Sequence, residues 1–515
     1  MRKIRLYIIA SSLVLVTAIG ISSCTDKFEE YNTDASRLTE LDASAVGNAF
    51  AASQHRGVMF SWQLFQSLFG DLQAQYYGNI AQNFGSDRNF MNGNWLNGAF
   101  NGFYNQIPAL LGVLENTAPG GKAANPAVYA IANIWKVKVY QPVTDNWGPI
   151  PYSAVGNGLK SVDYDAQDVI YKDFLTTLAK STADLQAFKG KNVLGSNDLV
   201  YGGDVDKWIL FANTLRLRIA IRISGVEPAL AKTNAEAAVA GGVMETNAHD
   251  AFVKTTANNI NSFNQATAWN EFRMSAAMES VLTGFEDPRI SKFYAPLPGT
   301  TATFKGIRNG YTQVELGLPE NQNTKLSNVA DRFLPANQTT NPFEVMMAAE
   351  AWFLRAEGAL KGWNMGAGTA KTFYDKGIET SMKQWGISDA AAIAAYTAST
   401  KTPIAVTGAV VSPALSDITV VWSANPAKQL EQVITQKWIA LWPNGVEAWA
   451  EYRRTGFPKL YPRMNSESLF VSKDQVIRRT PFVIGETQTN APGLATGVAK
   501  LGGADNEATR LWWNK

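Results

Sequence analysis

The chain has 515 residues and a formal net charge of +2, with 46 lysines and arginines against 44 aspartates and glutamates. Three of the basic residues, Arg2, Lys3 and Arg5, stand at its start, and without them the formal charge is −1. A near-neutral chain lacks the basic surface that binding to a phosphate backbone requires, so we expect no nucleic-acid partner. The chain has one cysteine and therefore no intramolecular disulfide, but it is long enough to bury a core without one.

Residues 1–23 have the layout of a secretory signal peptide. The basic start is followed by an almost wholly apolar run, residues 6–21, and then by Ser22 and Ser23. The run is too short, and too closely followed by acidic residues, to predict a membrane-spanning helix. The stretch that ends at Cys24 resembles a bacterial lipobox, in which the cysteine becomes the lipidated first residue of the mature protein. The alternative is an ordinary signal peptide with a cysteine nearby by chance, but the position of the sole cysteine favours lipidation.

A lipid on Cys24 would place the protein in the cell envelope of an exporting bacterium. Two or more acyl chains hold a protein stably on a bilayer, so the body needs no membrane helix of its own. Residues 24–44 are polar and acidic, which predicts the lipidated N-terminus and a tether. Residues 45–515 are then expected to form a single folded domain.

Hydrophobic periodicity predicts helices in the first half of this domain. The expected helical stretches are residues 45–69, 103–114, 126–140, 167–188 and 204–222. The last is the clearest amphipathic helix, with Asp204 or Asp206 as its N-cap. Residues 76–97 are rich in Gly, Asn and aromatic residues and predict a loop or a loosely helical crossing. Residues 144–152, TDNWGPIPY, contain two prolines and a glycine, which predict a compact turn instead of a helix.

The second half alternates helices with two long polar excursions. Helices are expected at residues 342–362, 369–386, 429–442 and 446–455. The excursions, about residues 245–342 and 397–426, are expected to hold loops and short strands, and the longer one is expected to be functional. From residue 462 onward the chain is expected to be irregular, with Trp512 and Trp513 holding it to the body. These helix pairs predict a mainly α fold similar to a tetratricopeptide-type solenoid.

Sequence motifs for catalysis or metal binding are missing. His55 and His249 are far apart and stand in no H-E-x-x-H context, and there is no G-x-S-x-G or phosphate-binding loop. The pair Asp204 and Asp206 resembles the start of a calcium loop, but helix capping explains it better. We therefore expect no catalytic residue, no metal and no cofactor. A pair of carboxylates for glycoside hydrolysis stays open, since any two of 44 acids could meet at ~5–9 Å.

Several segments together resemble one family. They are TDNWGPIPY, KWILFANTLRLRIAIR, EDPRISKFYAP, AAEAWFLRAEGALKGW, TQKWIALWPNGVEAWAEYRRTGFPKL and the terminal LWWNK. In this order, from Cys24 to Lys515, they are similar to the SusD/RagB-like outer-membrane lipoproteins of Bacteroidetes, closest to the SusD-like lipoproteins of the second type. One departure lies at residues 478–486, where the family more often has a Tyr-Pro pair after the two arginines.

The resemblance implies a SusD-like fold, in which tetratricopeptide-like helix pairs support a face of variable loops. It implies a lipid-anchored receptor at the cell surface that acts as a hinged lid on a SusC-like TonB-dependent transporter. Such a lid captures an oligosaccharide or an oligopeptide and passes it to the barrel, without catalysis. The aromatic and Asn-rich loops favour an oligosaccharide. A surface-anchored glycoside hydrolase on the same scaffold is the alternative from another functional class.

The resemblance also implies where the ligand binds. In relatives the ligand face uses the early loop segment and the central excursion, so aromatic and hydrogen-bonding residues of these segments are the candidates: Tyr77, Arg88, Trp95, Asn97, Trp269, Asn270 and Tyr311. Tryptophan and tyrosine would stack on the ligand, while arginine and asparagine would form hydrogen bonds. Regular helical faces instead predict a core role for Trp208, Trp352, Trp438 and Trp449. Arg453 and Arg454 are expected to be structural, pairing with acids such as Glu447 or with helix-end carbonyls.

Overall fold

Helices dominate the part of the chain that the structure describes. The computed structural model describes residues 43–514 and contains 53% helix and 5% strand, which confirms the expected mainly α fold. The predicted signal peptide, Cys24 and nearly all of the tether lie outside the described residues, so the structure does not test them. No helix within residues 43–514 is both long and apolar enough to cross a bilayer.

The helices of the first half are α3 (Ala43–Met59), the π-helix η1 (Gln63–Gly70), α4 (Asp71–Gln73), α5 (Gly93–Tyr104), α6 (Ile107–Thr117), α7 (Pro126–Trp147), α8 (Gln167–Leu185), α9 (Val205–Arg222) and α10 (Pro228–Ala240). Those of the second half are α11 (Ser262–Thr267), α12 (Ala276–Met278), the π-helix η6 (Glu279–Thr283), α13 (Ile290–Phe293), α14 (Gln313–Leu316), α15 (Ala348–Leu360), α16 (Ala370–Gln384), α17 (Ala390–Thr397), α18 (Pro426–Leu441), α19 (Gly445–Thr455), α20 (Ile484–Thr489) and α21 (Ala491–Lys500). Short 3₁₀ turns, among them η2 (Ser86–Arg88), η9 (Asp331–Phe333) and η10 (Pro335–Asn337), lie in the connections.

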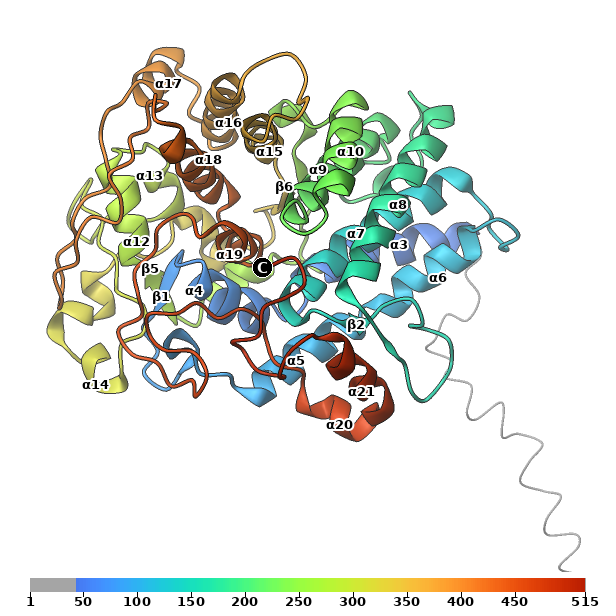
Figure 1. Cartoon of the computed structure of the whole chain (residues 1–515), viewed down its shortest axis with the longest axis horizontal. Helices are drawn as coiled ribbons and strands as arrows, with labels where there is room; N and C mark the ends of the chain where they lie inside the picture. Colours follow the sequence, from blue (N-terminus) through green and yellow to red (C-terminus); the bar gives the residue numbers. More distant parts are fainter. Residues whose placement is uncertain (1–42, 515) are drawn as a thin grey trace, which may run out of the picture.

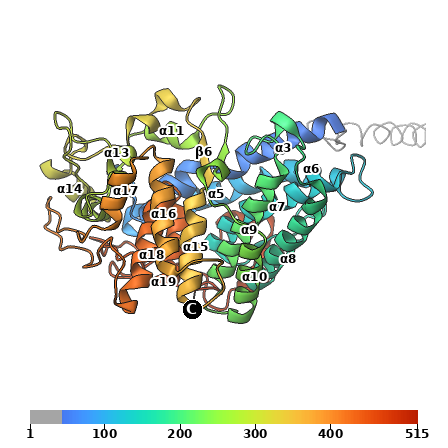
Figure 2. The ribbon, with the colours of Figure 1, turned by 90° about the horizontal axis from the view of Figure 1, so that it is seen from above.

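Neighbouring helices pack side by side and build two groups (Figure 1). Helices α6 to α10 pack in sequence order, each against the next, and α3 lies across α6 and α7. Helices α15, α16 and α18 form the second group, seen from above in Figure 2, with α19 packed against α18. A contact between α9 and α15 joins the groups. This stacking of helix pairs is the expected scaffold.

The amphipathic stretches form helices close to the predicted positions. Helices α8, α9, α16, α18 and α19 confirm the predictions for their segments. The predicted helix 342–362 is wrong at its start, where Phe343–Met346 forms a strand that pairs with residues 251–253, and helix α15 begins at Ala348. Asp204 caps α9, because its side chain accepts a hydrogen bond from the Lys207 backbone N–H at 3.1 Å. Helices α10 and α17 are additional. Alanine-rich and weakly amphipathic, they give little periodic signal.

The predicted turn at residues 144–152 is wrong in its first half. Helix α7 continues through Pro142 to Trp147 and ends at Gly148, whose φ of +85° suits glycine. The other prolines of the segment, Pro149 and Pro151, lie after this end and cannot disturb the helix. Pro142 removes one helical hydrogen bond, but nearly the whole last turn is buried and held by tertiary packing, which outweighs the loss.

The strands form three two-stranded antiparallel ribbons. Strand β1 (Tyr77–Asn79) pairs with β5 (Phe272–Met274), β2 (Ile150–Pro151) with β3 (Tyr164–Asp165), and β4 (Ala251–Val253) with β6 (Phe343–Met346). Strands β4 and β5 lie inside the expected excursion 245–342, and β6 directly follows it, which confirms loops with short strands. The prediction of a loop or a loosely helical crossing at residues 76–97 is wrong at its start, which forms β1, whereas the end of the segment is helical as the start of α5.

The C-terminal tail is more regular than predicted. It contains α20 and α21, short helices rich in Gly, Thr and Ala that carry a weak pattern. Its last residues are held to the body as expected. Trp513 is buried against the guanidinium groups of Arg222 and Arg453, with centroid distances of 5.1 and 5.0 Å, and Trp512 packs against Tyr171.

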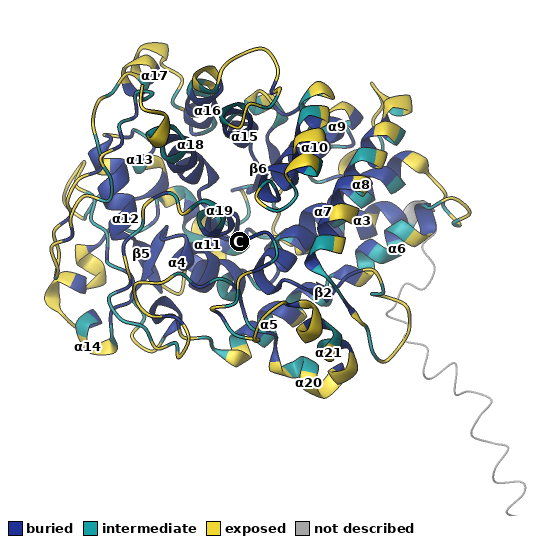
Figure 3. Ribbon diagram, viewed as in Figure 1, coloured by how far each residue is buried: buried dark blue, intermediate teal, exposed yellow. Residues whose placement is uncertain are grey.

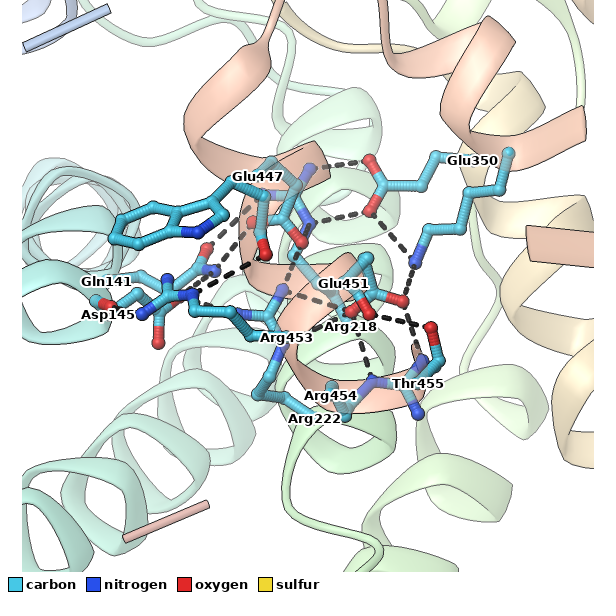
Figure 4. Close-up of polar contacts among 12 residues, drawn as sticks. Gln141, Asp145, Arg218, Arg222, Glu350, Glu447, Glu451, Arg453, Arg454 and Thr455 are labelled. Atoms are coloured by element: carbon cyan, nitrogen blue, oxygen red, sulfur yellow. Dashed lines mark hydrogen bonds and ion pairs between the residues drawn. The ribbon is translucent and has the colours of Figure 1, made fainter. Parts of the chain in front are cut away.

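Charged side chains lie in the middle of the molecule, where almost everything is buried (Figure 3). Ten of them form a connected network, which we call the charged cluster: Asp145, Arg218, Arg222, Glu350, Glu357, Lys437, Glu447, Glu451, Arg453 and Arg454. Figure 4 labels all of them except Glu357 and Lys437. They come from α7, α9, α15, α18 and α19, so the cluster ties both helix groups together. Arg454 binds both oxygens of Glu357 at 2.6 Å, and Arg453 donates to the carbonyls of Asp145 and Arg478. Both arginines are structural, as predicted.

Candidate ligand-binding site

The β1–β5 ribbon brings the two predicted binding segments together. Tyr77 pairs with Met274 and Asn79 with Phe272, and beyond the strands the Ile80 N–H donates to the Glu271 carbonyl at 2.9 Å. Because the strands are antiparallel, the chain leaving β1 and the chain entering β5 meet at one end of the ribbon. The aromatic loop after Ile80 therefore lies beside the segment 269–271, although the two are far apart in sequence.

Trp95 belongs to the first of these segments and stands in the first turn of α5. Asn92 caps that helix, because its side chain accepts hydrogen bonds from the backbone N–H groups of Asn94 and Trp95 at 3.1 and 3.2 Å. The Trp95 ring is half-buried and meets Phe84 edge to face, with 4.8 Å between ring centroids. One part of the indole is thus fixed by packing, while another part stays accessible.

Trp269 and Asn270 belong to the second segment and are exposed. Trp269 directly follows α11 and is 49% exposed, which is unusual for a residue that normally buries most of its surface. Asn270 has a φ of +58°, a left-handed conformation that asparagine tolerates, and its side-chain oxygen accepts a hydrogen bond from Arg273. The turn is held in this way while the indole before it projects into solvent.

Glu271 and Gln63 add a polar pair that the sequence analysis did not select. The Gln63 side-chain N–H₂ donates to both carboxylate oxygens of Glu271, at 2.8 and 2.7 Å. Glu271 is 8% exposed, and this burial raises the pKa of its carboxyl despite the hydrogen bonds from Gln63. The WNE sequence that places Glu271 beside two candidates was a usable signal. Gln63 gave none, since its partner lies about two hundred residues away in the chain.

Two of the predicted residues are buried and offer no face to a ligand. Tyr77 is fully buried between rings that include Phe272 and Trp442. Tyr311 lies in a small apolar cluster with Leu316 and Leu326. Each packs beneath the surface loops and leaves the candidate set for this reason.

Two other predicted residues, Arg88 and Asn97, use side-chain polar groups in contacts within the protein. Arg88 is buried, forms an ion pair with Glu467 and donates to the Tyr311 carbonyl at 3.1 Å. The side-chain oxygen of Asn97 accepts from the Gly485 N–H at 3.0 Å and so joins α5 to α20. Both residues therefore support the loops around the site, although the half-buried Asn97 keeps its side-chain N–H₂ donors, as Asn270 does. The predicted residues that remain candidates are Trp95, Trp269 and Asn270. Together with the Gln63–Glu271 pair we call them the ribbon-end site.

An open hollow of about 370 Å³ lies nearby, beside the 3₁₀ turn η9. Helix α11 packs on this turn, because Asn264 donates to the Arg332 carbonyl at 2.9 Å. The hollow is lined by Tyr294, Arg332 and Trp385, among others, and the Arg332 guanidinium lies 5.0 Å from the Trp385 ring. Its volume falls in the range of small-ligand pockets.

Other predicted features of the sequence have structural roles. Trp208, Trp438 and Trp449 are buried in the core as expected, and Trp352 is half-buried against Phe373. The ring of His249 completes the capping box of a 3₁₀ turn. Within residues 43–514 no cluster of three or more histidine, cysteine, aspartate or glutamate side chains could hold a metal ion.

Comparison with known proteins identifies the family. Residues 25–514 match the family model described as SusD-like, SusD and RagB outer membrane lipoprotein. A chitin-binding SusD homolog from Flavobacterium johnsoniae is 35% identical, with a TM-score of 0.82 over 91% of this chain and 98% of that one. SusD homologs from Bacteroides vulgatus and Bacteroides uniformis are 32% and 33% identical, with TM-scores of 0.82 and 0.81. They cover 91% and 92% of this chain, and 97% and 100% of their own length is covered.

No curated protein sequence matches the chain. The family match spans nearly the whole chain, and the solved relatives share both its fold and about a third of its residues. The chain therefore belongs to the SusD-like family of outer membrane lipoproteins.

Proposed function

We propose that this protein captures an oligosaccharide at the cell surface and delivers it to a SusC-like TonB-dependent transporter, on which it acts as a lid. Proteins of this family in general bind carbohydrate at the outer membrane and associate with SusC. The observation that carries the proposal is the ribbon-end site, where the exposed Trp269 and the half-buried Trp95 accompany a carboxylate–amide pair. Oligopeptides are the second candidate ligand.

The chemistry of the ribbon-end site suits a sugar chain. A pyranose ring has an apolar face that packs on an indole, and hydroxyl groups around its edge. The Glu271 carboxylate accepts hydrogen bonds from hydroxyl or N-acetyl N–H groups, and the Asn270 side chain retains its N–H₂ donors. The relative from Flavobacterium johnsoniae is described as chitin-binding. Oligomers of N-acetylglucosamine are therefore the first ligands to test.

The site supports binding better than hydrolysis. Glycoside hydrolases use two carboxyl groups ~5–9 Å apart, one of which donates a proton. Among the residues of the ribbon-end site only Glu271 carries a carboxylate, and Gln63 engages both of its oxygens. A carboxylate held in this way orients a ligand, and a lid needs no more than that.

The proposal is tested by isothermal titration calorimetry with chito-oligosaccharides, other neutral oligosaccharides and mixed oligopeptides. We expect binding of one oligosaccharide class, and we expect its loss in the double variant Trp95→Ala, Trp269→Ala. Leu159→Ala, which truncates a 69% exposed residue outside the site, is the control and should bind normally. Unchanged binding in the double variant would remove the site, and binding of peptides alone would replace the ligand class.

The hydrolase alternative needs a separate measurement. Each oligosaccharide that binds is incubated with the protein overnight, and the products are separated by chromatography. We expect no shortening of the chain. A shortened product that disappears in Glu271→Gln would contradict a pure binding role.

The lid function also requires an anchor, which we assign to a lipid on Cys24. Cys24→Ser should leave the protein unlipidated and free in the soluble fraction of cells that lack the transporter. Membrane-bound Cys24→Ser protein in such cells would contradict this assignment. Co-purification of the wild-type protein with an outer-membrane barrel, and its loss on deleting that barrel, tests the partner.

A further inference from the structure

One buried cation has no partner. Lys138 lies on α7 and is 7% exposed, yet its ammonium group forms no hydrogen bond and no ion pair with any residue from 43 to 514. Burial, and then the nearby Arg218, lower its pKa to about 8, so the group is still mainly charged at pH 7. An unpaired charge on a residue that is this deeply buried is costly, because it keeps only a small part of its hydration.

The carboxylates of the charged cluster beside Lys138 are already paired with other cations. Its five carboxylates face five cations, so the cluster is balanced without Lys138. The carboxylates nearest to the Lys138 ammonium in electrostatic effect are Glu447 and Glu350. Glu447 is engaged by Arg222, and Glu350 accepts two hydrogen bonds from Arg218 at 2.7 and 2.5 Å. Lys138 is therefore one positive charge in excess.

A cavity of about 30 Å³ adjoins this lysine. Its polar lining includes Lys138, Arg218, Gln66, Gln141 and Asn444, while aromatic and aliphatic side chains close the remainder. A second cavity of about 20 Å³ shares part of this lining, including Arg218 and Asn444. One water needs about 10–15 Å³ measured in this way, so the larger cavity accommodates a small ion or two waters.

Two carboxylates also line the cavity, but both are already paired. Glu447 belongs to the charged cluster, and Glu344 forms an ion pair with Arg332 at 2.6 Å. The groups at the cavity with unused capacity for an anion are the Lys138 ammonium and the side-chain N–H₂ groups of Gln66 and Asn444. Gln141 is not one of them, because its N–H₂ donates to Asp145 and Glu447. The Gln66 oxygen accepts from the Val446 N–H, which leaves the N–H₂ of Gln66 as a donor.

We propose that the cavity beside Lys138 binds a small monovalent anion of the chloride class, which is the counter-ion that the charged cluster does not supply. The ammonium provides the charge, and the surrounding amide N–H groups provide hydrogen bonds. The small volume of the cavity favours a halide or an ion of similar size over a larger anion. The site is separate from the ribbon-end site and does not depend on the proposed function.

A bromide soak tests the site directly, since bromide replaces chloride and gives an anomalous X-ray signal. Crystals of the purified protein grown without halide are soaked in sodium bromide. We expect an anomalous peak within hydrogen-bonding distance of the Lys138 Nζ atom. Water alone in the cavity, with no anomalous peak there, would overturn the proposal.

Thermal unfolding provides the matching test in solution. In sodium chloride the wild-type Tm should exceed its value in sodium gluconate of equal ionic strength by about 2 °C or more, because gluconate is too large for the cavity. Lys138→Met should lose this difference and should be the more stable protein in gluconate, where the wild-type charge is unpaired. Lys189→Met, which changes an exposed lysine, should keep the wild-type response and corrects for general salt effects. An equal chloride effect in Lys138→Met and wild type would overturn the proposal, and the bromide experiment decides the matter if Lys138→Met does not fold.

Discussion

The charged cluster and the ribbon-end site use polar groups in opposite ways. In the cluster, carboxylates pair with guanidinium and ammonium groups from five helices out of contact with water, as Arg222 does with Asp145, Glu447 and Glu451. At the ribbon end, the Trp269 ring lies half in solvent and Asn270 keeps a free amide. This difference indicates that paired polar side chains hold the fold together. Side chains with exposed rings or unpaired hydrogen-bonding groups instead mark the surface that is available to a ligand.

Removing one cluster cation should have the largest effect. Arg222→Met leaves Asp145, Glu447 and Glu451 short of a partner in a fully buried place, which should lower the free energy of unfolding by about 3–5 kcal/mol. Urea denaturation followed by circular dichroism measures the change. As a control, Lys180→Ala breaks an exposed ion pair on α8 and should cost no more than about 0.5 kcal/mol. Equal effects of the two substitutions would show that the cluster does not stabilise the fold.

Acid should weaken the cluster next. Burial alone would raise the pKa of Glu447, but Arg222 and Arg218 reverse this and hold it at about 2, below the ordinary 4.5. Because the pKa of Glu447 is lowered, the contribution of its carboxylate to the free energy of unfolding is fully present above about pH 4.5. That contribution is lost as the pH falls toward 2. The pKa of Glu451 is also lowered, so Glu451 contributes in the same way. Burial raises the pKa of Asp145, and the effect of Asp145 on stability therefore becomes less favourable as the pH rises.

We therefore expect the Tm to fall steeply from pH 4.5 to pH 2, measured by scanning calorimetry. Glu447→Gln should have a lower Tm at pH 7 and a shallower acid dependence, because one of the titrating groups is gone. Glu115→Gln, at an exposed position of α6, should follow the wild-type curve closely. A Glu447→Gln curve parallel to the wild-type curve would contradict the assignment.

The two tryptophans of the ribbon-end site should separate binding from stability. Trp269→Ala should reduce oligosaccharide affinity about 10- to 100-fold, with a stability change within about 0.5 kcal/mol, because the ring packs little in the free protein. Trp95→Ala should lose affinity and also about 1 kcal/mol of stability, because it removes the contact with Phe84. For both variants, calorimetric titration measures the affinity for the oligosaccharide, and urea denaturation measures the free energy of unfolding. If only Trp269→Ala lost stability, the Trp269 ring and not the Trp95 ring would be the one that packing holds in place, contrary to our description.

Much of the scaffold could be predicted from the sequence because amphipathic periodicity is a local signal. Helix α9 shows this, with its apolar positions at regular spacing and Asp204 as its cap. Helix α7 shows the limit. Local rules for proline and glycine end it too early, whereas in the structure Asp145 pairs with Arg222 and helps to keep the last turn helical. The pairing partner lies on another helix and leaves no trace in the local pattern.

The candidate site could be predicted only in part, for the same reason. The aromatic segments that the sequence selects meet at one end of the β1–β5 ribbon, and Trp95 and Trp269 are accessible there. Whether an aromatic residue of those loops is exposed depends on long-range pairing, and Tyr77 is buried because β1 pairs with β5 beneath them. Composition predicts which segment carries a site, but the register of distant strands decides which side chains reach its surface.

Glu271 gives the smallest and most specific prediction. Its pKa is raised by burial, so the carboxylate becomes protonated at a higher pH than an exposed glutamate and then loses its capacity as a charged acceptor. Oligosaccharide affinity should therefore fall about two- to five-fold as the pH is lowered from 7 to 5. Glu271→Gln keeps the size of the side chain, and its amide can still hydrogen-bond to Gln63, but it has no charge to lose.

This variant should bind the oligosaccharide several-fold more weakly than wild type at pH 7, with an affinity that no longer depends on pH. Calorimetric titrations of wild type and Glu271→Gln at pH 7 and pH 5 give the four dissociation constants that this comparison needs. If both proteins lost affinity equally at pH 5, the titrating group would lie elsewhere. If Glu271→Gln matched the wild type at both values, Glu271 would support the loop without contacting the ligand, and the ribbon-end site would act through its two tryptophans and Asn270.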